Sequence, residues 1–215
     1  MTLFSIYNLN ETLNKSLKNI NFTNPTPIQE KSIPLILQGK DILGSAQTGT
    51  GKTAAFCIPI LELLMKSPRG SLLIMIPTRE LAKQVLDVIN SLLGFKSSIN
   101  TATLIGGESM SKQLSELKKR PRIYVGTPGR INDHLQRGTL NLHDTKYLVL
   151  DETDRMLDMG FEVQINKIIK FLPVSKQVLM FSATIPNNIL KLSSKYPKFV
   201  NEIWNSPNSL SSSSR

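Results

Sequence analysis

The segment Ala46-Gln47-Thr48-Gly49-Thr50-Gly51-Lys52-Thr53 decides the fold, because its glycines, lysine and final hydroxyl have the spacing of a phosphate-binding loop. Residues 41–45 before it have the pattern of a buried strand, and residues 52–65 after it have that of an amphipathic helix. Glycines let successive N–H groups point at one anion, and the helix N-terminus adds unpaired donors and partial positive charge. We therefore expect Lys52 to reach the β- and γ-phosphates of a nucleotide and the Thr53 hydroxyl to bind Mg²⁺.

The loop motif leaves the class of nucleotide-binding protein open. Its first position is Ala46, where the strict pattern has glycine, and the competing interpretation is a surface turn rich in glycine and threonine. The position between a strand and a helix favours the phosphate-binding interpretation. The motif then predicts a nucleotide and a metal, but it does not choose among ATPases, GTPases, kinases and motors.

Composition and charge limit the class of protein. The chain has 215 residues, 40% of them hydrophobic, which suits one α/β domain with a substantial core. It has no apolar run long enough to span a membrane and no signal-peptide features in its first ten residues, so we expect a cytoplasmic chain. Cys57 is the only cysteine and has apolar neighbours, which predicts a buried thiol. The net charge of +10 favours a polyanionic partner, with nucleic acid first.

Short apolar runs alternate with helical patterns along the chain. The strands expected in this way cover residues 41–45, 72–76, 101–105, 123–125, 147–150 and 178–181. The helices expected after the first one cover residues 80–93, 111–119, 130–136, 163–172 and 187–195. Strands that are apolar on both faces and joined by helical crossovers are typical of an α/β fold with a mostly parallel central sheet and helices on both faces.

Polar residues directly follow each expected strand. The segments concerned are residues 46–53, Pro77-Thr78-Arg79, Gly106-Gly107, Thr127-Pro128-Gly129-Arg130, Asp151-Glu152 and Ser182-Ala183-Thr184. Ligands of doubly wound sheets bind beyond the carboxyl ends of the strands. We therefore expect all six segments to lie along one rim of the sheet.

Asp151 and Glu152 are adjacent carboxylates that would repel each other without a cation. A Mg²⁺ ion held by Asp151, with Glu152 orienting and deprotonating a water molecule, gives the pair a chemical purpose. The competing interpretation is a pair of solvated acids that open the next turn. The phosphate-binding loop upstream favours the metal site.

Several motifs together resemble one known family. Phe22…Pro25-Thr26-Pro27-Ile28-Gln29 is followed, in order, by AQTGTGKT, PTREL, GG, TPGR, DETD and SAT. The set resembles the N-terminal RecA-like domain of a DEAD-box ATP-dependent RNA helicase of bacterial type. The resemblance runs from Phe4 to Val200 and implies a RecA-like P-loop fold that uses ATP, Mg²⁺ and RNA.

The resemblance also implies the residues that handle ATP. Phe22 would stack on adenine, Phe4 is placed for a further aromatic contact, and Gln29 would pair with the adenine edge and so select ATP over GTP. Without the resemblance, Gln29 reads as a residue that opens a helix after Pro27. The implied ATP-binding set is Phe22, Gln29, Ala46, Gln47, Thr48, Gly49, Thr50, Gly51, Lys52 and Thr53. The implied catalytic residues are Glu152, Lys52 and Asp151, and the implied Mg²⁺ ligands are Thr53 and Asp151.

The same resemblance implies contacts to the RNA backbone and to a second domain. The implied RNA-binding residues are Thr78, Arg79, Gly106, Gly107, Thr127 and Arg130. Their hydroxyl, guanidinium and backbone N–H groups bind phosphates without reading bases. Asp154, Ser182 and Thr184 would couple ATP hydrolysis to RNA binding through interdomain hydrogen bonds. His134 and His143 match no motif, and we expect both in surface or capping roles.

Two positions and one domain depart from the family pattern. Thr153 replaces the alanine of Asp-Glu-Ala-Asp, and Asn21 replaces the glycine before Phe22, where asparagine also tolerates a positive φ. Nothing in the sequence resembles the His-Arg-x-Gly-Arg motif of the second RecA-like domain. We therefore expect one domain over residues 1–204, a disordered tail at residues 205–215, and a second RecA-like domain that is missing or supplied elsewhere.

Three functions remain open from the sequence. The first is the ATP-binding half of an RNA helicase, acting as a monomer. The second is a truncated ATP- and RNA-binding module with little hydrolysis, which a comparison of ATPase rates with and without RNA would separate from the first. The third is another P-loop ATPase, such as a DNA helicase or a transporter ATPase, against which Phe22, Gln29 and the TPGR motif argue.

Overall fold

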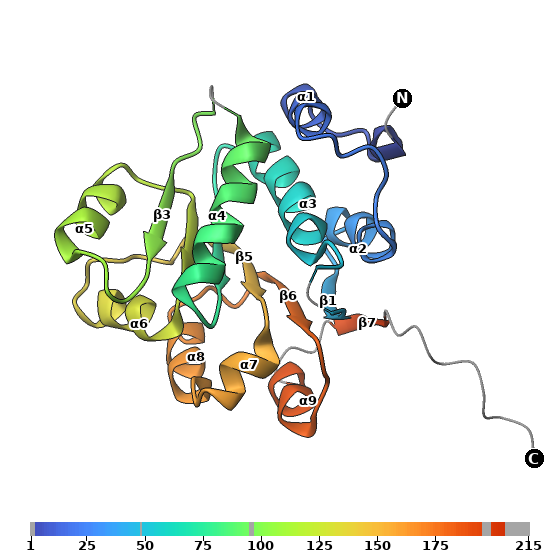
Figure 1. Cartoon of the computed structure of the whole chain (residues 1–215). Coiled ribbons are helices and arrows are strands. Elements are labelled where there is room, and N and C mark those ends of the chain that lie inside the picture. Colours follow the sequence, from blue (N-terminus) through green and yellow to red (C-terminus); the bar gives the residue numbers. More distant parts are fainter. Residues whose placement is uncertain (1–2, 48, 95–96, 195–198, 205–215) are drawn as a thin grey trace, which may run out of the picture.

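The structure is a computed structural model that describes residues 3–47, 49–94, 97–194 and 199–204 (Figure 1). Thr48 and the predicted tail at residues 205–215 lie outside the described residues. The strands are β1 (Asp41–Ser45), β2 (Ser71–Met75), β3 (Thr101–Leu104), β4 (Ile123–Gly126), β5 (Thr145–Leu150), β6 (Gln177–Ser182) and β7 (Phe199–Trp204). The helices are η1 (Leu3–Tyr7), α1 (Glu11–Asn19), α2 (Pro27–Leu37), α3 (Lys52–Lys66), α4 (Arg79–Leu93), α5 (Met110–Lys118), α6 (Pro128–Gln136), α7 (Thr153–Asp158), α8 (Glu162–Ile169) and α9 (Asn187–Ser193).

The described strands form one seven-stranded sheet with the order β3-β4-β2-β5-β6-β1-β7. All of its pairings are parallel; Leu73 of β2, for example, is opposite Tyr124 of β4 and Leu148 of β5. Because the chain crosses between parallel strands through helices, the sheet is covered on both faces. The predicted α/β fold is confirmed.

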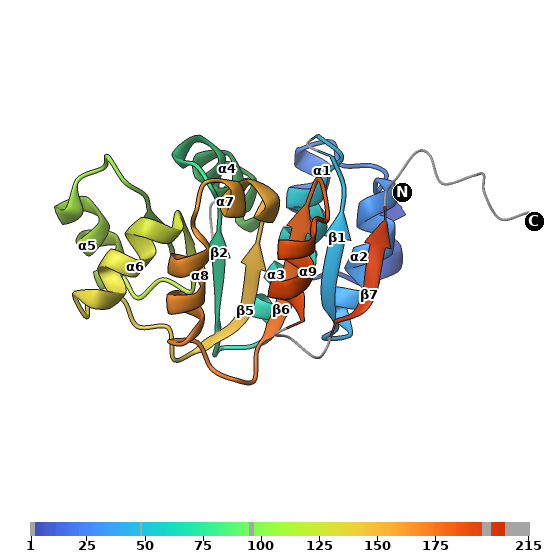
Figure 2. The ribbon, with the colours of Figure 1, turned by 90° about the horizontal axis from the view of Figure 1, so that it is seen from below.

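Alternate residues of each central strand face two separate hydrophobic cores. In β2, Leu72 and Ile74 belong to the core under α2, α3 and α4, whereas Leu73 and Met75 belong to the core under α6 and α8. Figure 2 shows α3 on one face of the sheet and α8 and α9 on the other. Burial on both faces explains why these strands show no polar alternation in the sequence.

The six predicted polar segments follow β1, β2, β3, β4, β5 and β6 in turn. Since all the pairings are parallel, the carboxyl ends of these strands lie at the same rim of the sheet. The prediction of a single rim is confirmed. Strand β1 lies between β6 and β7, so the phosphate-binding loop is inside the sheet order rather than at its edge.

Several elements were not predicted. Helix α1 has only nine residues, and its apolar face consists of two residues, Leu13 and Leu17, which is too short a pattern to recognise. Helix α7 follows Asp151-Glu152 directly, and strand β7 pairs with β1 from the C-terminal side of the described chain. Asn21 has φ 58°, as its substitution for glycine suggested.

Candidate nucleotide and nucleic-acid site

The phosphate-binding loop joins the end of β1 to the first turn of α3. Gly51 precedes the helix with φ 92°, and a Cβ at this position would lie 2.5 Å from Nε2 of Gln29. Both facts require glycine here, because other residues rarely adopt this φ and have no room for a side chain. The Thr50 hydroxyl donates to the carbonyl of Gln47 at 2.7 Å and closes the loop. Gln47 and Gly49 are exposed, so the loop is open to a ligand.

Lys52 is a buried cation that forms no ion pair with the described residues. Its exposed fraction is 6%, and Nζ has no hydrogen-bond partner within the described part of the chain. A buried ammonium group is costly unless it is paired and hydrogen-bonded. Among the described residues, the first residue of α3 therefore has no hydrogen-bonded anion at the place where the motif predicts phosphates.

Asp151 directly follows β5 and is 8% exposed. Burial raises its pKa to about 6, although the charge of Lys52 and a hydrogen bond from the N–H of Glu152 act in the opposite direction. The charges of the neighbouring Glu152 and Asp154 act in the same direction as burial. A cation at this position would remove the repulsion, so a metal fits the residues present. No group of three or more His, Cys, Asp or Glu side chains within the described residues has a metal-binding arrangement.

Glu152 has an unusual backbone conformation for a residue with a side chain. It caps the N-terminus of α7 with φ 50° and ψ 50°, in the left-handed region. Its carboxylate is 3.3 Å from a guanidinium nitrogen of Arg155, and its side chain is 15% exposed. Strained residues of this kind occur at functional sites more often than elsewhere.

Asp154, Ser182 and Thr184 form one hydrogen-bonded group between α7 and the segment after β6. Oδ2 of Asp154 accepts from the backbone N–H and the hydroxyl of Thr184, both at 3.0 Å. Ser182 accepts from the N–H of Asp154 and donates to the carbonyl of Thr184. Burial opposes ionisation of Asp154, but the hydrogen bonds from Thr184 hold its pKa below the ordinary value. The three predicted coupling residues are therefore in contact within this chain.

Of the side chains predicted for adenine, Gln29 contacts the loop. Gln29 is 3% exposed; its Oε1 accepts from the N–H of Thr26 at 3.0 Å, and its Nε2 donates to the carbonyl of Gly51 at 3.1 Å. It thus has the helix-opening role that the sequence alone suggested, at the start of α2. Phe22 is half-buried and stacks on Phe4, with ring centroids 6.4 Å apart. Phe4 itself is fully buried behind it.

The predicted RNA-binding residues gather at the N-termini of α4 and α6. Thr78 caps α4 by accepting from the N–H of Leu81. Arg79 is exposed and lies against Gly107, where a Cβ would collide with its guanidinium group and where φ is 73°. Gly106, beside Gly107, is half-buried. A side chain at position 107 would displace Arg79, so the glycine shapes this surface.

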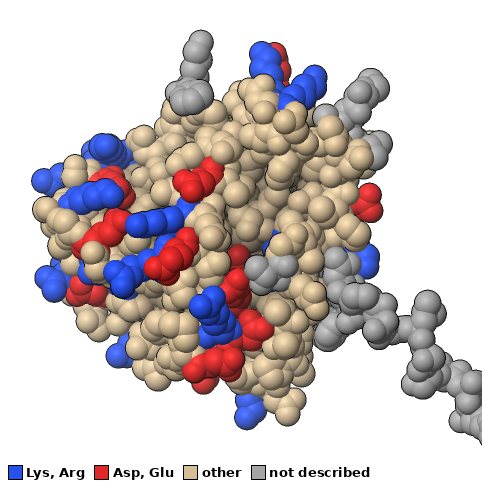
Figure 3. Space-filling model, viewed as in Figure 1, with Lys and Arg blue, Asp and Glu red and all other residues tan. Residues whose placement is uncertain are grey.

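Thr127 precedes α6, and Arg130 in its first turn donates to the carbonyl of Glu108 at 3.4 Å. The Glu108 carboxylate pairs with Lys83 of α4 and Lys112 of α5, each at 3.3 Å. Figure 3 shows basic and acidic side chains interleaved over the part of the surface formed by α4, α5 and α6. The Glu108 carboxylate thus forms ion pairs with two lysines close to the predicted RNA contacts.

Comparison with known proteins identifies the family. The DEAD/DEAH box helicase family model matches residues 26–192. The chain belongs to the DEAD/DEAH box helicase family.

Individual relatives of this helicase family cover most of the chain. The ATP-dependent RNA helicase CshA of Listeria monocytogenes is 47% identical over 197 residues, which is 91% of this chain and 38% of the relative. The DEAD-box ATP-dependent RNA helicase RhpA of Helicobacter pylori is 45% identical over 89% of this chain and 39% of its own length. A crystal structure of a DEAD box protein from the hyperthermophile Methanococcus jannaschii is 46% identical with a TM-score of 0.83, covering 88% of this chain and 52% of that one. The predicted RecA-like fold and the family resemblance are confirmed.

The chain spans about two fifths of the length of these curated relatives and about half of the solved structure. No helix within the described residues is both long and apolar enough to cross a lipid bilayer.

Thr153, which stands where the helicase family has alanine, forms hydrogen bonds. Thr153 is fully buried, and its hydroxyl lies 3.1 Å from the carbonyls of both Leu150 and Phe181. It therefore connects the end of β5 to the end of β6, next to Asp151 and Ser182. Its side chain points to backbone carbonyls rather than to solvent.

One expectation about histidine was wrong. His134 is fully buried instead of being at the surface, and it connects Gln113 of α5 (3.0 Å) to Thr139 (2.8 Å) after α6. Nε2 of Gln113 donates to the carbonyl of Ile105, which assigns its Oε1 as the acceptor of a proton on Nε2 of His134. The network fixes α6, which carries Arg130, next to the segment that carries Gly106. No motif could reveal it, because its partners are far apart in the sequence.

Proposed function

We propose that this chain is the ATP-binding half of an ATP-dependent RNA helicase and that it couples ATP binding and hydrolysis to RNA remodelling. The single observation that carries the proposal is Lys52, a buried cation at the N-terminus of α3 whose Nζ has no hydrogen-bond partner among the described residues. A nucleotide triphosphate provides the anion that this position lacks. The names of the relatives, which are ATP-dependent RNA helicases, support the same function.

Gln29 supports the choice of adenine. An amide side chain has two lone pairs on its oxygen and two hydrogens on its nitrogen. The internal contacts to Thr26 and Gly51 use one of each. The remaining acceptor and donor match the donor and acceptor on the adenine edge, while Phe22 offers the face of its ring for stacking.

The residues around the loop support Mg²⁺ as cofactor and water as the attacking group. The Thr53 hydroxyl and the Asp151 carboxylate would hold the metal, which neutralises phosphate charge when it is bound. Glu152 would orient the water and accept its proton. Lys52 would stabilise charge on the phosphates. The loop residues Gln47, Thr48, Gly49, Thr50 and Gly51 would contribute backbone donors. The N–H of Ala46 already donates to the carbonyl of Ser182 at 3.0 Å, so Ala46 would hold the loop against β6.

The residues that follow β2, β3 and β4 support RNA as the bound polymer. Exposed Arg79 and half-buried Arg130 offer charge at the N-termini of α4 and α6, and Thr78, Thr127, Gly106 and Gly107 offer hydroxyl and N–H donors. The net charge of +10 favours a polyanion in general. Such contacts position a phosphate backbone without reading base sequence.

The proposal includes a second RecA-like domain, because Asp154, Ser182 and Thr184 would complete their coupling role against a partner domain. The second domain would also supply arginine fingers to the ATP site, and an arginine finger contributes about 10³- to 10⁵-fold to turnover. We accordingly place the domain at residues 1–204, followed by a tail at 205–215, and expect it to act in the cytoplasm as a monomer. The alternative is an ATP- and RNA-binding module with little hydrolysis.

An ATPase and strand-displacement experiment on the 215-residue chain tests the proposal. We expect ATP binding, slow ATPase activity that RNA stimulates weakly, and no unwinding of an RNA duplex by the chain alone. Robust ATP-dependent unwinding would contradict the need for a second domain. ATPase activity that responds to DNA rather than RNA, or a preference for GTP, would favour another P-loop ATPase.

A further inference from the structure

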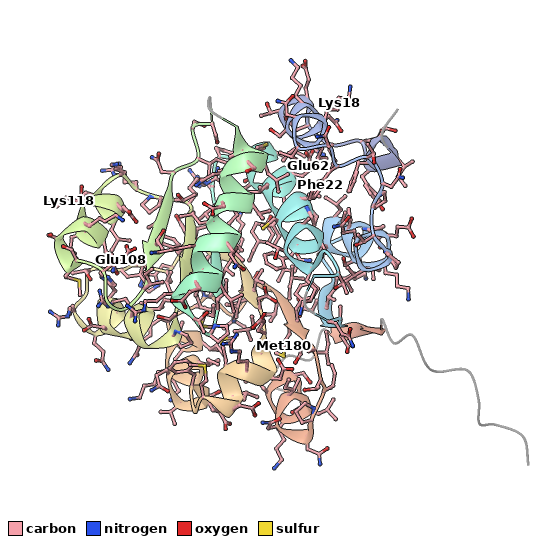
Figure 4. The ribbon with its side chains drawn as sticks, viewed as in Figure 1. Lys18, Phe22, Glu62, Glu108, Lys118 and Met180 are labelled. Carbon is pink, nitrogen blue, oxygen red and sulfur yellow. The ribbon has the colours of Figure 1, made fainter. Side chains whose placement is uncertain are left out.

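Glu62 is a buried carboxylate on the helix that begins at the phosphate-binding loop. It lies ten residues after Lys52 on α3 and is 1% exposed. Its Oε2 accepts a hydrogen bond from the backbone N–H of Asn10 at 2.6 Å, across 52 positions of sequence. Its Oε1 lies 2.9 Å from Nζ of Lys66, whose side chain is 61% exposed. Figure 4 shows Glu62 and Phe22 in the region where α1 meets α3.

Asn10 begins the segment that carries the adenine-binding aromatic residue. Its side chain accepts from the N–H of Thr12 and caps α1, so the Glu62 carboxylate lies at the positive end of that helix. At the other end of α1, the N–H of Phe22 donates to the carbonyl of Leu17 at 2.8 Å. We call residues 3–22 the N-terminal flank. Within the flank, α1 connects the Glu62 contact at Asn10 to Phe22.

The N-terminal flank also contacts the body of the domain through apolar side chains. Phe4, Leu13 and Leu17 are fully buried and belong to the same core as the apolar face of α3. Apolar burial is strong but non-directional, so it holds the flank without fixing its register on α3. The hydrogen bond from Asn10 to Glu62 is directional, and it fixes one point of the flank on α3.

We propose that Glu62 is a positioning residue that sets the distance between the adenine subsite on the N-terminal flank and the phosphate subsite at Lys52. The inference rests on the proposed ATP function. ATP requires both subsites in register, whereas inorganic tripolyphosphate requires only the loop. If only a fraction of the molecules keeps the flank in register, the apparent affinity for ATP falls in proportion to that fraction. The affinity for tripolyphosphate does not change.

The experiment titrates the 215-residue chain with ATP and, separately, with tripolyphosphate, both with Mg²⁺, by calorimetry. We expect Glu62→Ala to raise the Kd for ATP about tenfold, since the partly buried N–H of Asn10 loses its acceptor. The Kd for tripolyphosphate should stay within about twofold. Glu62→Gln keeps an oxygen acceptor and should restore ATP binding to nearly the original value.

Two control variants separate the hydrogen bond from general charge effects. Lys66→Ala removes the exposed partner of Glu62 but leaves the bond to Asn10, and Glu11→Gln removes an exposed acid in the first turn of α1. Both should bind ATP like the original chain. Hydrogen exchange gives a readout without nucleotide: Glu62→Ala should speed exchange in residues 11–22 and leave residues 52–61 unchanged.

The outcomes distinguish this inference from the proposed function. An original chain that fails to bind ATP overturns the proposed function and the inference together. An original chain that binds ATP, with Glu62→Ala binding it equally well, overturns the inference alone. Equal weakening of ATP and tripolyphosphate, or failure of Glu62→Gln to restore ATP binding, also overturns it, because either result indicates a general loss of structure or a role for the charge.

Discussion

Nε2 of Gln29 donates a hydrogen bond to the carbonyl of Gly51 at 3.1 Å and so connects the start of α2 to the phosphate-binding loop. The same amide accepts from the N–H of Thr26. These two bonds fix the side chain in one orientation before any nucleotide arrives. A group that is held in this way contributes specificity at little entropic cost when a ligand binds.

The first prediction concerns nucleotide choice. Gln29→Ala should raise the Kd for ATP by about tenfold or more, because about 1 kcal/mol is lost for each hydrogen bond to adenine. The preference for ATP over GTP should fall at the same time. Gln38→Ala, at an exposed position after α2, is the matched control and should change neither value. Unchanged selectivity in Gln29→Ala would remove this residue from adenine recognition.

The second prediction concerns the water-activating base. Glu152→Gln should abolish the residual ATPase turnover of the chain while ATP binding persists, since the amide cannot accept a proton from water. Steady-state phosphate release and equilibrium ATP binding are the two measurements. Glu162→Gln, an exposed acid in the first turn of α8, serves as control. Equal turnover in Glu152→Gln and the original chain would rule out the base role.

The third prediction concerns Thr153. Its hydroxyl is within 3.1 Å of two carbonyls, so Thr153→Val should reduce the free energy of unfolding by about 1–3 kcal/mol, because it buries a methyl group against both carbonyls. Thr153→Ala, which restores the family residue, should cost less and should leave ATP binding intact. Urea unfolding measures the difference. A Thr153→Val protein as stable as the original chain would show that the hydroxyl contributes nothing to the fold.

The fourth prediction concerns pH. Burial, and then the charge of Arg130, lower the pKa of His134 from its ordinary value of 6.5. On acidification the unfolded chain therefore takes up this proton first, so its contribution to stability is lost as the pH falls through about 6.5. The free energy of unfolding should decline less steeply between about pH 7.5 and pH 5 in His134→Gln than in the original chain. His143→Gln, at an exposed position, should leave the slope unchanged, and an equal slope in all three proteins would contradict the prediction.

Local sequence was sufficient to predict the rim of the sheet. The apolar runs gave β1, β2, β5 and β6 because strands buried on both faces show no polar interruption. The residues after each run then had to share one edge. Helix α1 was missed because its apolar face has only two residues. Strand β7 was missed because the polar pair Asn201 and Glu202 interrupts its apolar run, and it is a strand through its pairing with the distant β1.

Residues that act through long-range contacts could not be predicted. Glu62 contacts Asn10 across 52 positions, and His134 contacts Gln113 across 21. Glu62 has the sequence context of an acid on a solvated helix face, and His134 that of a surface histidine near a helix end. The fold alone brings Asn10, which caps α1, to Glu62 of α3, and Gln113 of α5 to His134 of α6.

A titration of the 215-residue chain with ATP and Mg²⁺, repeated with Lys52→Met, tests whether the chain binds ATP through Lys52. We expect saturable binding of ATP by the original chain and at least about tenfold weaker binding by the variant, because methionine has no ammonium group to pair with the phosphates. Absence of saturable binding by the original chain, or equal affinity in the two proteins, would contradict it.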